Sequence, residues 1–341
     1  MVGRAFVLVV AVASGCGRFG FDALSTSTST TDGRVVDGFT IDSAFVSDAV
    51  PGVSCQTAAL MCGPGNESCC TSPLVTGGTF FRGYDVAGDA MFTDTSNPAT
   101  VSNFRLDKYE VTVERFRAFV DSGQGTQASP PPAGAGAHPL IANSGWNPAW
   151  NNQLALDTAA LRAKLRCNAV LSTWTSTPGA NEKLPVSCVT WFDAFAFCAW
   201  DGGRLATEAE WNYAASGGAA QRAYPWSIPS SSTTIDSSYS GYQQGLASFS
   251  NIVPVGSLTA GYGSYGQADL AGNVAEWALD YTLSTYPNPC TDCANISAGA
   301  NRSLRGGSFE SDSSGVRSAL RGVDGPSQTR EANGIRCARS M

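Results

Sequence analysis

Cysteine is the side chain on which most of the possible chemistry of this sequence depends. The 341 residues include eleven cysteines and a single histidine, His138. Cys290 and Cys293 have the two-residue spacing of a zinc-binding pair, but such a site needs a second pair or further histidines. A local disulfide between Cys290 and Cys293 is therefore favoured over a metal site. Cys167 and Cys188, which flank a tryptophan and a proline, are predicted to form another bridge.

The first sixteen residues have the pattern of an export signal. Arg4 precedes an apolar run from Ala5 to Ala13, and small residues lead to Cys16. The run is too short for a permanent membrane helix, so residues 1–15 are predicted to be a cleaved signal peptide. The residues before Cys16 resemble a bacterial lipobox, in which Cys16 carries a lipid. The alternative is an ordinary signal peptide with Cys16 incidental.

An exported chain of this kind is expected on the bacterial cell envelope. With Cys16 lipidated it is a membrane-anchored lipoprotein, and without lipidation it is periplasmic or secreted. Residues 16–54, rich in Ser, Thr, Asp and Gly, have the composition of a flexible tether. The formal net charge of -7 leaves no basic face for phosphates, which argues against a nucleic-acid partner.

Residues 55–75 form a small Cys-rich segment with few apolar side chains, so disulfides have to stabilise it. Cys69 and Cys70 are adjacent and poorly placed to bond each other. Each is predicted to pair with Cys55 or Cys62, and both combinations stay open. In an exported chain the ten cysteines after Cys16 are expected to be disulfide-bonded.

From residue 76 to the end, the pattern is that of one globular domain. Three segments have apolar residues at helical spacing and a threonine able to cap the first turn: Thr112, Thr190 and Thr207. Each of these segments ends near a glycine. The remainder is rich in Gly, Ser, Asn and Trp, with only short strand-like runs. An irregular, loop-rich α+β domain is therefore predicted.

Eight segments of residues 76–341, taken together and in order, resemble the formylglycine-generating enzyme, or sulfatase-modifying factor, family. The resemblance implies a C-type lectin-like fold for this whole region. The segments are Gly77-Gly-Thr-Phe-Phe81, Asp107-Lys-Tyr-Glu-Val-Thr112, Pro185-Val-Ser-Cys-Val-Thr-Trp191, Gly202-Gly-Arg-Leu-Ala-Thr-Glu-Ala-Glu-Trp211, Tyr224-Pro-Trp-Ser227, Gly272-Asn-Val-Ala-Glu-Trp277, Leu304-Arg-Gly-Gly-Ser-Phe309 and Gly334-Ile-Arg-Cys-Ala-Arg339.

The resemblance also implies a disulfide pairing. The family bonds a cysteine in the helix before its GGRLPTEAEW run to a cysteine near the C-terminus, and these positions are Cys198 and Cys337. A second family disulfide falls on Ala215 and Ser318, so both of its cysteines are missing together.

A structural calcium site is implied at the turn between Asp269 and Glu276. These residues would supply carboxylates, and Gly272 and Val274 would supply backbone carbonyls, an all-oxygen set that suits Ca²⁺. Two carboxylates in a buried turn are costly without a cation. The alternative is that Asp269 caps a turn and Glu276 pairs with a core arginine such as Arg204.

The resemblance fails at the catalytic residues. The oxidases of this family bind Cu(I) with two cysteines after their Gly-Gly-Ser run, since Cu(I) selects thiolates. The first of these positions falls on Ser311, and no cysteine lies between Arg305 and Arg336. The single histidine also excludes the three-histidine iron site of the sulfoxide-forming relatives. No copper is expected.

Family pocket positions are matched at Ser308, Arg317 and Arg321, although buried arginines could equally brace a loop-rich core. We expect a monomeric, non-catalytic, calcium-stabilised binding or scaffolding module whose ligand is an unidentified peptide, protein or glycan. One alternative is an oxidoreductase of the formylglycine-generating type acting on protein cysteine. Others are a divergent enzyme that uses Ser308, Glu310 and Asp312 in the same cleft, and a purely structural envelope protein.

Overall fold

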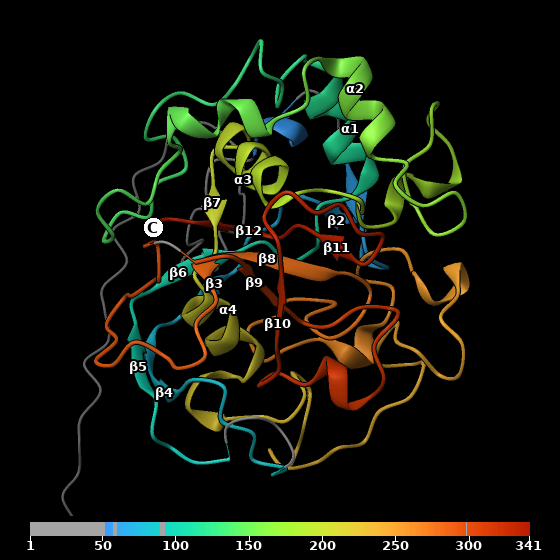
Figure 1. Cartoon of the computed structure of the whole chain (residues 1–341). Helices are drawn as coiled ribbons and strands as arrows, with labels where there is room; N and C mark the ends of the chain where they lie inside the picture. Colours follow the sequence, from blue (N-terminus) through green and yellow to red (C-terminus); the bar gives the residue numbers. More distant parts are fainter. Residues whose placement is uncertain (1–51, 57–59, 89–92, 298) are drawn as a thin grey trace, which may run out of the picture. The chain divides into compact units, whose positions relative to one another are not determined.

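The computed structural model describes residues 52–56, 60–88, 93–297 and 299–341. The predicted signal peptide, Cys16 and most of the predicted tether lie outside these ranges. The described part is a mixed α/β body in which loops outnumber regular elements (Figure 1). Its helices are α1 (Val113–Asp121), α2 (Thr158–Lys164), α3 (Trp191–Trp200) and α4 (Glu208–Ala215). Its strands are β1 (Met61–Cys62), β2 (Glu67–Ser68), β3 (Leu74–Val75), β4 (Gly78–Phe81), β5 (Pro98–Val101), β6 (Phe104–Leu106), β7 (Arg204–Leu205), β8 (Ala275–Tyr281), β9 (Arg302–Arg305), β10 (Arg321–Asp324), β11 (Asn333–Gly334) and β12 (Cys337–Arg339).

Two small sheets form the centre of the body. One has the strand order β10-β9-β8-β11, and the other has the order β3-β6-β12-β7. Figure 1 shows α3 on one side of these strands and α4 on the other. The strands are short, and much of the core is filled by large aromatic side chains that contact one another, as Trp191 and Phe195 do at 5.2 Å between ring centroids.

The three predicted helices begin where their caps predict. Thr112 accepts a hydrogen bond from the backbone of the first turn of α1. Thr190 and Thr207 form capping boxes with Asp193 and Glu210, the side chain of each member bonding the backbone of the other. α2, capped by Asp157, was not among the predicted helices.

Five disulfides join the ten cysteines of the described residues. Cys198 bonds Cys337, Cys167 bonds Cys188 and Cys290 bonds Cys293, which are the pairs that the sequence predicts. In the Cys-rich segment the open question is settled as Cys55–Cys70 and Cys62–Cys69. So many disulfides indicate an exported protein. Within the described ranges, no helix is long and apolar enough to cross a membrane.

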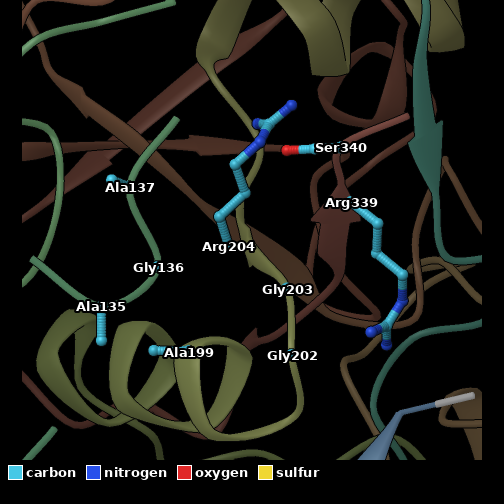
Figure 2. Close-up of a pocket in the computed structure, with 9 residues that line it drawn as sticks. All are labelled: Ala135, Gly136, Ala137, Ala199, Gly202, Gly203, Arg204, Arg339 and Ser340. Carbon is cyan, nitrogen blue, oxygen red and sulfur yellow. The ribbon is translucent and has the colours of Figure 1, made fainter. Parts of the chain in front are cut away.

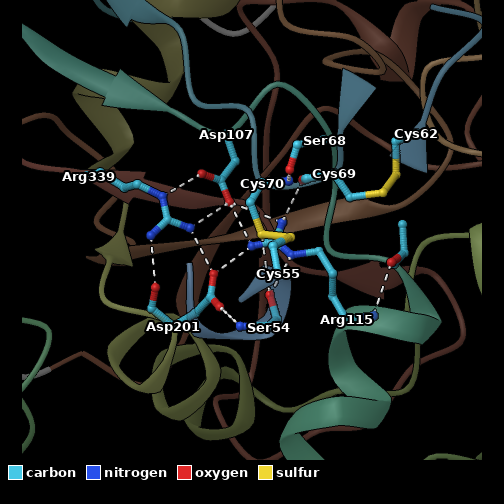
Figure 3. The surroundings of a disulfide bond; sticks show 11 residues. Ser54, Cys55, Cys62, Ser68, Cys69, Cys70, Asp107, Arg115, Asp201 and Arg339 are labelled. Atoms are coloured by element: carbon cyan, nitrogen blue, oxygen red, sulfur yellow. Dashed lines mark hydrogen bonds and ion pairs between the residues drawn. A yellow bond between two sulfur atoms is a disulfide. The ribbon is translucent and has the colours of Figure 1, made fainter. Parts of the chain in front are cut away.

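The Cys-rich segment packs on the main domain through a buried group of alternating charges (Figure 3). Arg115 bonds Asp107 at 3.1 Å and Asp201 at 2.7 Å, and Arg339 bonds the same two carboxylates at 3.0 and 2.8 Å. Ser54 joins this group, since its backbone N–H donates to Asp201 at 2.7 Å. We call these two arginines and two aspartates the charge quartet. Ser54 is buried, so the ordered chain begins ahead of Cys55.

Candidate functional site

A cleft of about 280 Å³ opens beside strands β8, β9, β10 and β11. The loop that follows β9 forms one wall, with Ser308 and Ser311 among its lining residues. Asp324 and Arg330 line the opposite part of the cleft. The cleft therefore lies where the sequence places the family's reaction site, and two of the five predicted cleft residues face it.

The two serine hydroxyls are engaged by the backbone of their own loop. The backbone N–H of Ser308 donates to Ser311 Oγ at 3.0 Å, and the N–H of Glu310 donates to Ser308 Oγ at 3.2 Å. Gly307 is left-handed (φ 64°), and a Cβ there would lie 2.3 Å from the carbonyl oxygen of Gly315. The loop is thus closed tightly on itself, with hydroxyls at the position where the oxidases have a thiolate.

No described cysteine can replace the missing thiolates, because all ten are in disulfides. A disulfide sulfur carries no thiolate charge and is a poor ligand for Cu(I). The described residues also hold no group of three or more His, Cys, Asp or Glu side chains arranged for a metal ion. The donor set of the cleft does not fit copper.

The two arginines among the predicted site residues do not line the cleft, and their side chains contact other loops. Arg317 forms an ion pair with Asp85 at 3.0 Å. Arg321 donates to the carbonyl of Leu283 at 2.6 Å, and its guanidinium lies 4.5 Å from the ring centre of Tyr286. Both arginines therefore brace loops, as the structural alternative in the sequence analysis describes.

The acidic side chains proposed for a divergent enzyme are not arranged as an acid–base pair with Ser308. Asp312 accepts from Ser314 Oγ at 2.7 Å and from the N–H of Gly315 at 2.8 Å, which uses it as a turn residue. Burial, together with the nearby charge of Glu331, raises the pKa of Glu310. Among the described residues, no hydrogen bond joins either carboxylate to the Ser308 hydroxyl.

Sequence reasoning missed the polar residues on the far side of the cleft. Arg330 bonds Asp324 at 2.6 Å, and its side chain is 61% exposed. Asn333 also donates to Asp324, at 3.2 Å. No motif marks these residues, because the pairing joins β10 to the loop before β11. Glu310 and Glu331 do not line the cleft, but both are close enough to act on the charge of the Arg330 guanidinium.

The predicted calcium turn lies at the start of β8. Asp269, Gly272 and Asn273 all have positive φ (56°, 82° and 60°), which makes a tight, kinked loop. Asp269 Oδ2 accepts from the N–H of Gly256 at 2.6 Å, and no hydrogen bond to its other oxygen is seen among the described residues. That oxygen and the carbonyls of this turn remain candidate ligands.

The carboxylate of Glu276 has a different partner from the one that the sequence predicts. Its two oxygens accept from Arg336 at 2.7 to 3.0 Å and from Trp211 Nε1 at 2.6 Å. A core arginine therefore pairs with Glu276, but it is Arg336 and not Arg204. Arg204 instead bonds Glu210, at 2.6 Å. A calcium ion would have to share Glu276 with Arg336.

The charge balance around this turn favours a cation nonetheless. Three buried carboxylates, those of Glu110, Asp269 and Glu276, surround the single guanidinium of Arg336. Burial raises the pKa of Asp269 to about 6, and the charge of Glu276 contributes. Burial and the charges of Asp269 and Glu276 also raise the pKa of Glu110. The negative charges are thus incompletely compensated by Arg336. These three carboxylates do not form a metal-binding group among the described residues, and calcium at Asp269 stays a prediction.

Comparison with known proteins decides the family. Residues 60–341 match the sulfatase-modifying factor enzyme 1-like domain. The chain belongs to the sulfatase-modifying factor family. It is 34% identical to a formylglycine-generating enzyme of Streptomyces coelicolor over 283 residues, which cover 77% of this chain and 87% of that protein.

Other relatives show that membership of this family does not fix an activity. The chain is 29% identical over 287 residues to an inactive Cα-formylglycine-generating enzyme 2 of Mus musculus, covering 77% of this chain and 84% of the relative. The solved structure of PvdO from Pseudomonas aeruginosa has a TM-score of 0.54 and 20% identity, and the match covers 79% of this chain and 93% of PvdO. At that identity the structural likeness supports the fold alone.

The fold keeps the position of a disulfide that this member of the sulfatase-modifying factor family lacks. Ala215, at the end of α4, and Ser318 are both buried. The hydroxyl of Ser318 donates to the carbonyl of Ala215 at 3.1 Å. A hydrogen bond therefore lies where the resemblance places the second family disulfide.

Proposed function

We propose that this protein is a non-catalytic binding module whose cleft beside Ser308 takes an extended protein segment carrying a positively charged side chain. The charge pattern of the cleft carries the proposal. Asp324 lines the cleft, and Glu310 and Glu331 lie near Arg330, so the three carboxylates outnumber this one guanidinium and would attract a Lys or Arg side chain of the ligand. Arg330 is largely exposed and its partner Asp324 is buried, so a cationic side chain of the ligand would take the place of the Arg330 guanidinium beside Asp324.

Loss of oxidase chemistry supports the non-catalytic part of this proposal. Oxidation of a substrate cysteine by O₂ at Cu(I) requires a soft ligand pair close to the substrate thiol. Here Ser308 and Ser311 hold the loop closed with their hydroxyls, and every described cysteine is bonded to another. The inactive relative shows that a member of the family can persist without that reaction.

Two further features complete the proposed role. Calcium at Asp269, Gly272, Val274 and Glu276 would stabilise the turn that leads into β8, a wall of the cleft. Export with lipidation at Cys16 would place the module on the envelope surface. A monomer is sufficient, because the cleft is made from one chain.

The test is direct binding of short peptides to the full chain. Fluorescence anisotropy should show a dye-labelled decapeptide with two arginines binding at least tenfold more tightly than the same peptide with two glutamates. Glu310→Gln should weaken the basic peptide severalfold. Asp121→Asn, which changes an exposed carboxylate at the end of α1, is the matched control and should leave affinity unchanged. Equal affinity for both peptides, or equal effects of the two substitutions, would refute the proposal.

A further inference from the structure

The groove drawn in Figure 2 offers space but no reactive side chain. It has a volume of about 460 Å³ and lies between residues 135–137 and residues 202–204. Arg204 and Arg339, the charged side chains that line it, are already paired with carboxylates of the domain. The other lining residues are alanine, glycine and serine. A residue pair with chemistry that the proposed function does not use lies instead in the loop between β8 and β9.

That pair is the disulfide between Cys290 and Cys293, which has the C-x-x-C spacing. The two cysteines are 3 positions apart in sequence, against 139 for Cys198 and Cys337. In the chain-entropy relation, a disulfide that closes a very short loop contributes little free energy to the folded state. The folded state therefore protects this bond little in return. A thiol can open it while the other four bridges still hold the domain.

The two sulfurs of this bridge differ in exposure. Cys290 is buried, whereas Cys293 is partly exposed, so a thiol from solvent can reach Cys293. The backbone holds the loop on β5. The N–H of Thr100 donates to the carbonyl of Cys290 at 2.9 Å, and the N–H of Asp292 donates to the carbonyl of Thr100 at 2.9 Å. Reduction breaks neither hydrogen bond, so the two thiols stay close enough to bond again.

A buried guanidinium lies against the exposed sulfur. Arg82 Nη1 donates to Cys293 Sγ at 3.5 Å, and Arg82 is 2% exposed. A cationic neighbour stabilises a thiolate, and burial strengthens the attraction. The carboxylate of Asp292 is bound to Ser102, whose N–H and hydroxyl donate to it at 2.6 and 2.7 Å. Once the disulfide is open, Cys293 is therefore the sulfur placed to carry a negative charge.

The bridge between Cys167 and Cys188 shows what this environment adds. Cys167 is also exposed, so its disulfide is accessible too. The sequence separation is 21, however, and the neighbour of Cys188 Sγ is the neutral hydroxyl of Ser172, at 3.1 Å. The short loop and the guanidinium thus distinguish Cys290–Cys293 from a bridge that is merely accessible.

We propose that Cys290–Cys293 is a redox-active disulfide that exchanges with cysteine thiols. A substrate thiolate attacks Cys293 Sγ, the bond between the two sulfurs breaks, and Cys290 leaves with the electron pair and takes a proton from solvent. A second substrate thiolate then attacks the substrate sulfur of the mixed disulfide. Cys293 leaves as a thiolate beside the guanidinium of Arg82.

The exchange is balanced without any further reactant. Two substrate thiols lose two electrons and become a disulfide, and the bridge gains these electrons as one thiol and one thiolate. Of the two protons that the substrate gives up, one is replaced on Cys290 and the other stays in solvent. The reaction is stoichiometric. Neither cysteine lines the cleft beside Ser308, so this inference does not depend on the binding function proposed above.

Partial reduction of the full chain compares the two accessible bridges. The folded protein is equilibrated with reduced glutathione or, in parallel, with a reduced peptide that carries two cysteines, and the free thiols are then alkylated and mapped. Cys290–Cys293 should open at a thiol concentration at least tenfold lower than Cys167–Cys188. Exchange with either thiol supports the proposal, and the faster arm names the source of the thiol. Opening of Cys167–Cys188 first, or no opening of Cys290–Cys293 by either thiol, would overturn it.

The role of the guanidinium is tested by alkylation of the reduced protein with iodoacetamide across pH. Arg82→Gln should slow the reaction of Cys293 severalfold at pH 6.5 and move the half-maximal rate to higher pH. Arg321→Gln is the matched control, because Arg82 and Arg321 lie 4.6 and 4.5 Å from the ring centre of Tyr286 but Arg321 donates to the carbonyl of Leu283. It should leave the rate unchanged. Equal pH profiles in the wild type and Arg82→Gln would overturn the proposal.

A trapping experiment keeps the proposal testable if Arg82→Gln fails to fold. With oxidised glutathione, Cys290→Ser leaves the accessible sulfur free and should form a mixed disulfide. Cys293→Ser leaves the buried sulfur and should react at least tenfold more slowly. Equal rates for the two variants would show that exposure and charge do not single out Cys293, which the proposal requires.

Discussion

Asp269 is the residue whose chemistry depends most on what binds beside it. Its carboxylate is buried, one oxygen accepts a single backbone hydrogen bond, and its pKa is raised to about 6. A buried carboxylate in this state is stabilised either by a proton or by a cation. Calcium binding and protonation are therefore competing ways to stabilise the same turn.

Removal of calcium is expected to lower the melting temperature of the wild type. A ligand that binds only the native state stabilises it by about 2.7 kcal/mol at a hundredfold excess over Kd. Asp269→Ala should abolish the difference between melting curves in calcium and in EDTA, whereas Asp269→Asn keeps a side-chain oxygen and should retain part of it. Glu276→Gln breaks the pair with Arg336 in any case, so its calcium response, and not its absolute stability, is the informative quantity. Curves that are identical in calcium and EDTA for the wild type would contradict the site.

Asp280 gives the protein an unusual dependence on pH. Burial raises the pKa of this carboxyl to about 7. The backbone N–H groups of Glu208 and Asn295 donate to it and favour the charged form, but burial has the larger effect. Because the folded pKa is above the unfolded value, the stabilisation is full below pH ~4 and is lost as pH rises through about 7. Asp269 acts in the same direction. Glu210, with a pKa lowered to about 2, titrates below this window.

The free energy of unfolding in EDTA is therefore expected to fall between pH 5 and pH 8. The slope should approach about −1.4 kcal/mol per pH unit for each buried carboxyl that keeps its proton in the folded protein while the unfolded chain has lost it. Urea unfolding at four pH values measures it, and Asp280→Asn should flatten the curve even if it lowers stability overall. A free energy that does not fall over this range would contradict the raised pKa and would indicate that the carboxyl is ionised in the folded protein throughout.

At the scale of elements, α4 is joined to the segment before β10 by a hydrogen bond in place of a disulfide. Ala215→Cys combined with Ser318→Cys should form a disulfide, because the resemblance places a family disulfide at these positions and the Ser318 hydroxyl lies 3.1 Å from the Ala215 carbonyl oxygen. The gain should be below the roughly 4.7 kcal/mol of a 100-residue loop, since Cys198–Cys337 already encloses both positions. Non-reducing peptide mapping detects the bond, and each single variant is its control. Two free thiols in the double variant would mean that the backbones are too far apart.

Elements with local signals could be predicted from the sequence, and those set by distant contacts could not. The helices that begin after Thr112, Thr190 and Thr207 are fixed by side chains within one turn of their starts. α2 was missed because it is short and buries a single side chain, Leu161. The strands are two to seven residues long, and their pairing joins distant segments, so no alternation pattern marks most of them.

The candidate site divides in the same way. Ser308 and Ser311 lie in a run whose residue types and order are recognisable, and both line the cleft. Asp324 and Arg330 carry no recognisable motif in the sequence, because they become neighbours only when β10 packs beside the loop before β11. Arg204 was the predicted alternative partner of Glu276. In the structure Arg204 pairs with Glu210, whose carboxylate is held nearby by the capping box at the start of α4.

For the molecule as a whole, the disulfide between α3 and β12 should contribute far more to the free energy of unfolding than the disulfide inside a loop. Cys198–Cys337 spans 139 residues, and Cys290–Cys293 spans 3. The chain-entropy relation gives about 5 kcal/mol for the first and about 2 kcal/mol for the second. Replacing each pair by alanine and measuring urea unfolding compares them directly. Equal losses would show that native-state packing, and not loop closure, determines the effect.

No formylglycine-generating activity is expected from the whole protein. Incubation with Cu(I), O₂ and a Cys-x-Pro-x-Arg peptide should give no aldehyde by mass spectrometry, while an active family member run in parallel should. Ser311→Cys with Gly315→Cys brings two thiols together, because an added Cβ at Gly315 would lie 2.9 Å from that of Ser311, and the loop has to shift slightly to accommodate it. This variant should bind Cu(I) in competition with a chelator. Turnover by the wild type would refute the non-catalytic proposal.

The charge quartet also determines how the domain responds to mechanical load. A force on the chain ahead of Gly52 reaches Ser54, which bonds Asp201, and then Cys55, which is covalently bonded to Cys70. Asp201 is in turn held by Arg339, at the other end of the sequence. A pull on the chain ahead of Gly52 is therefore carried by both the first and the last described segments of the sequence.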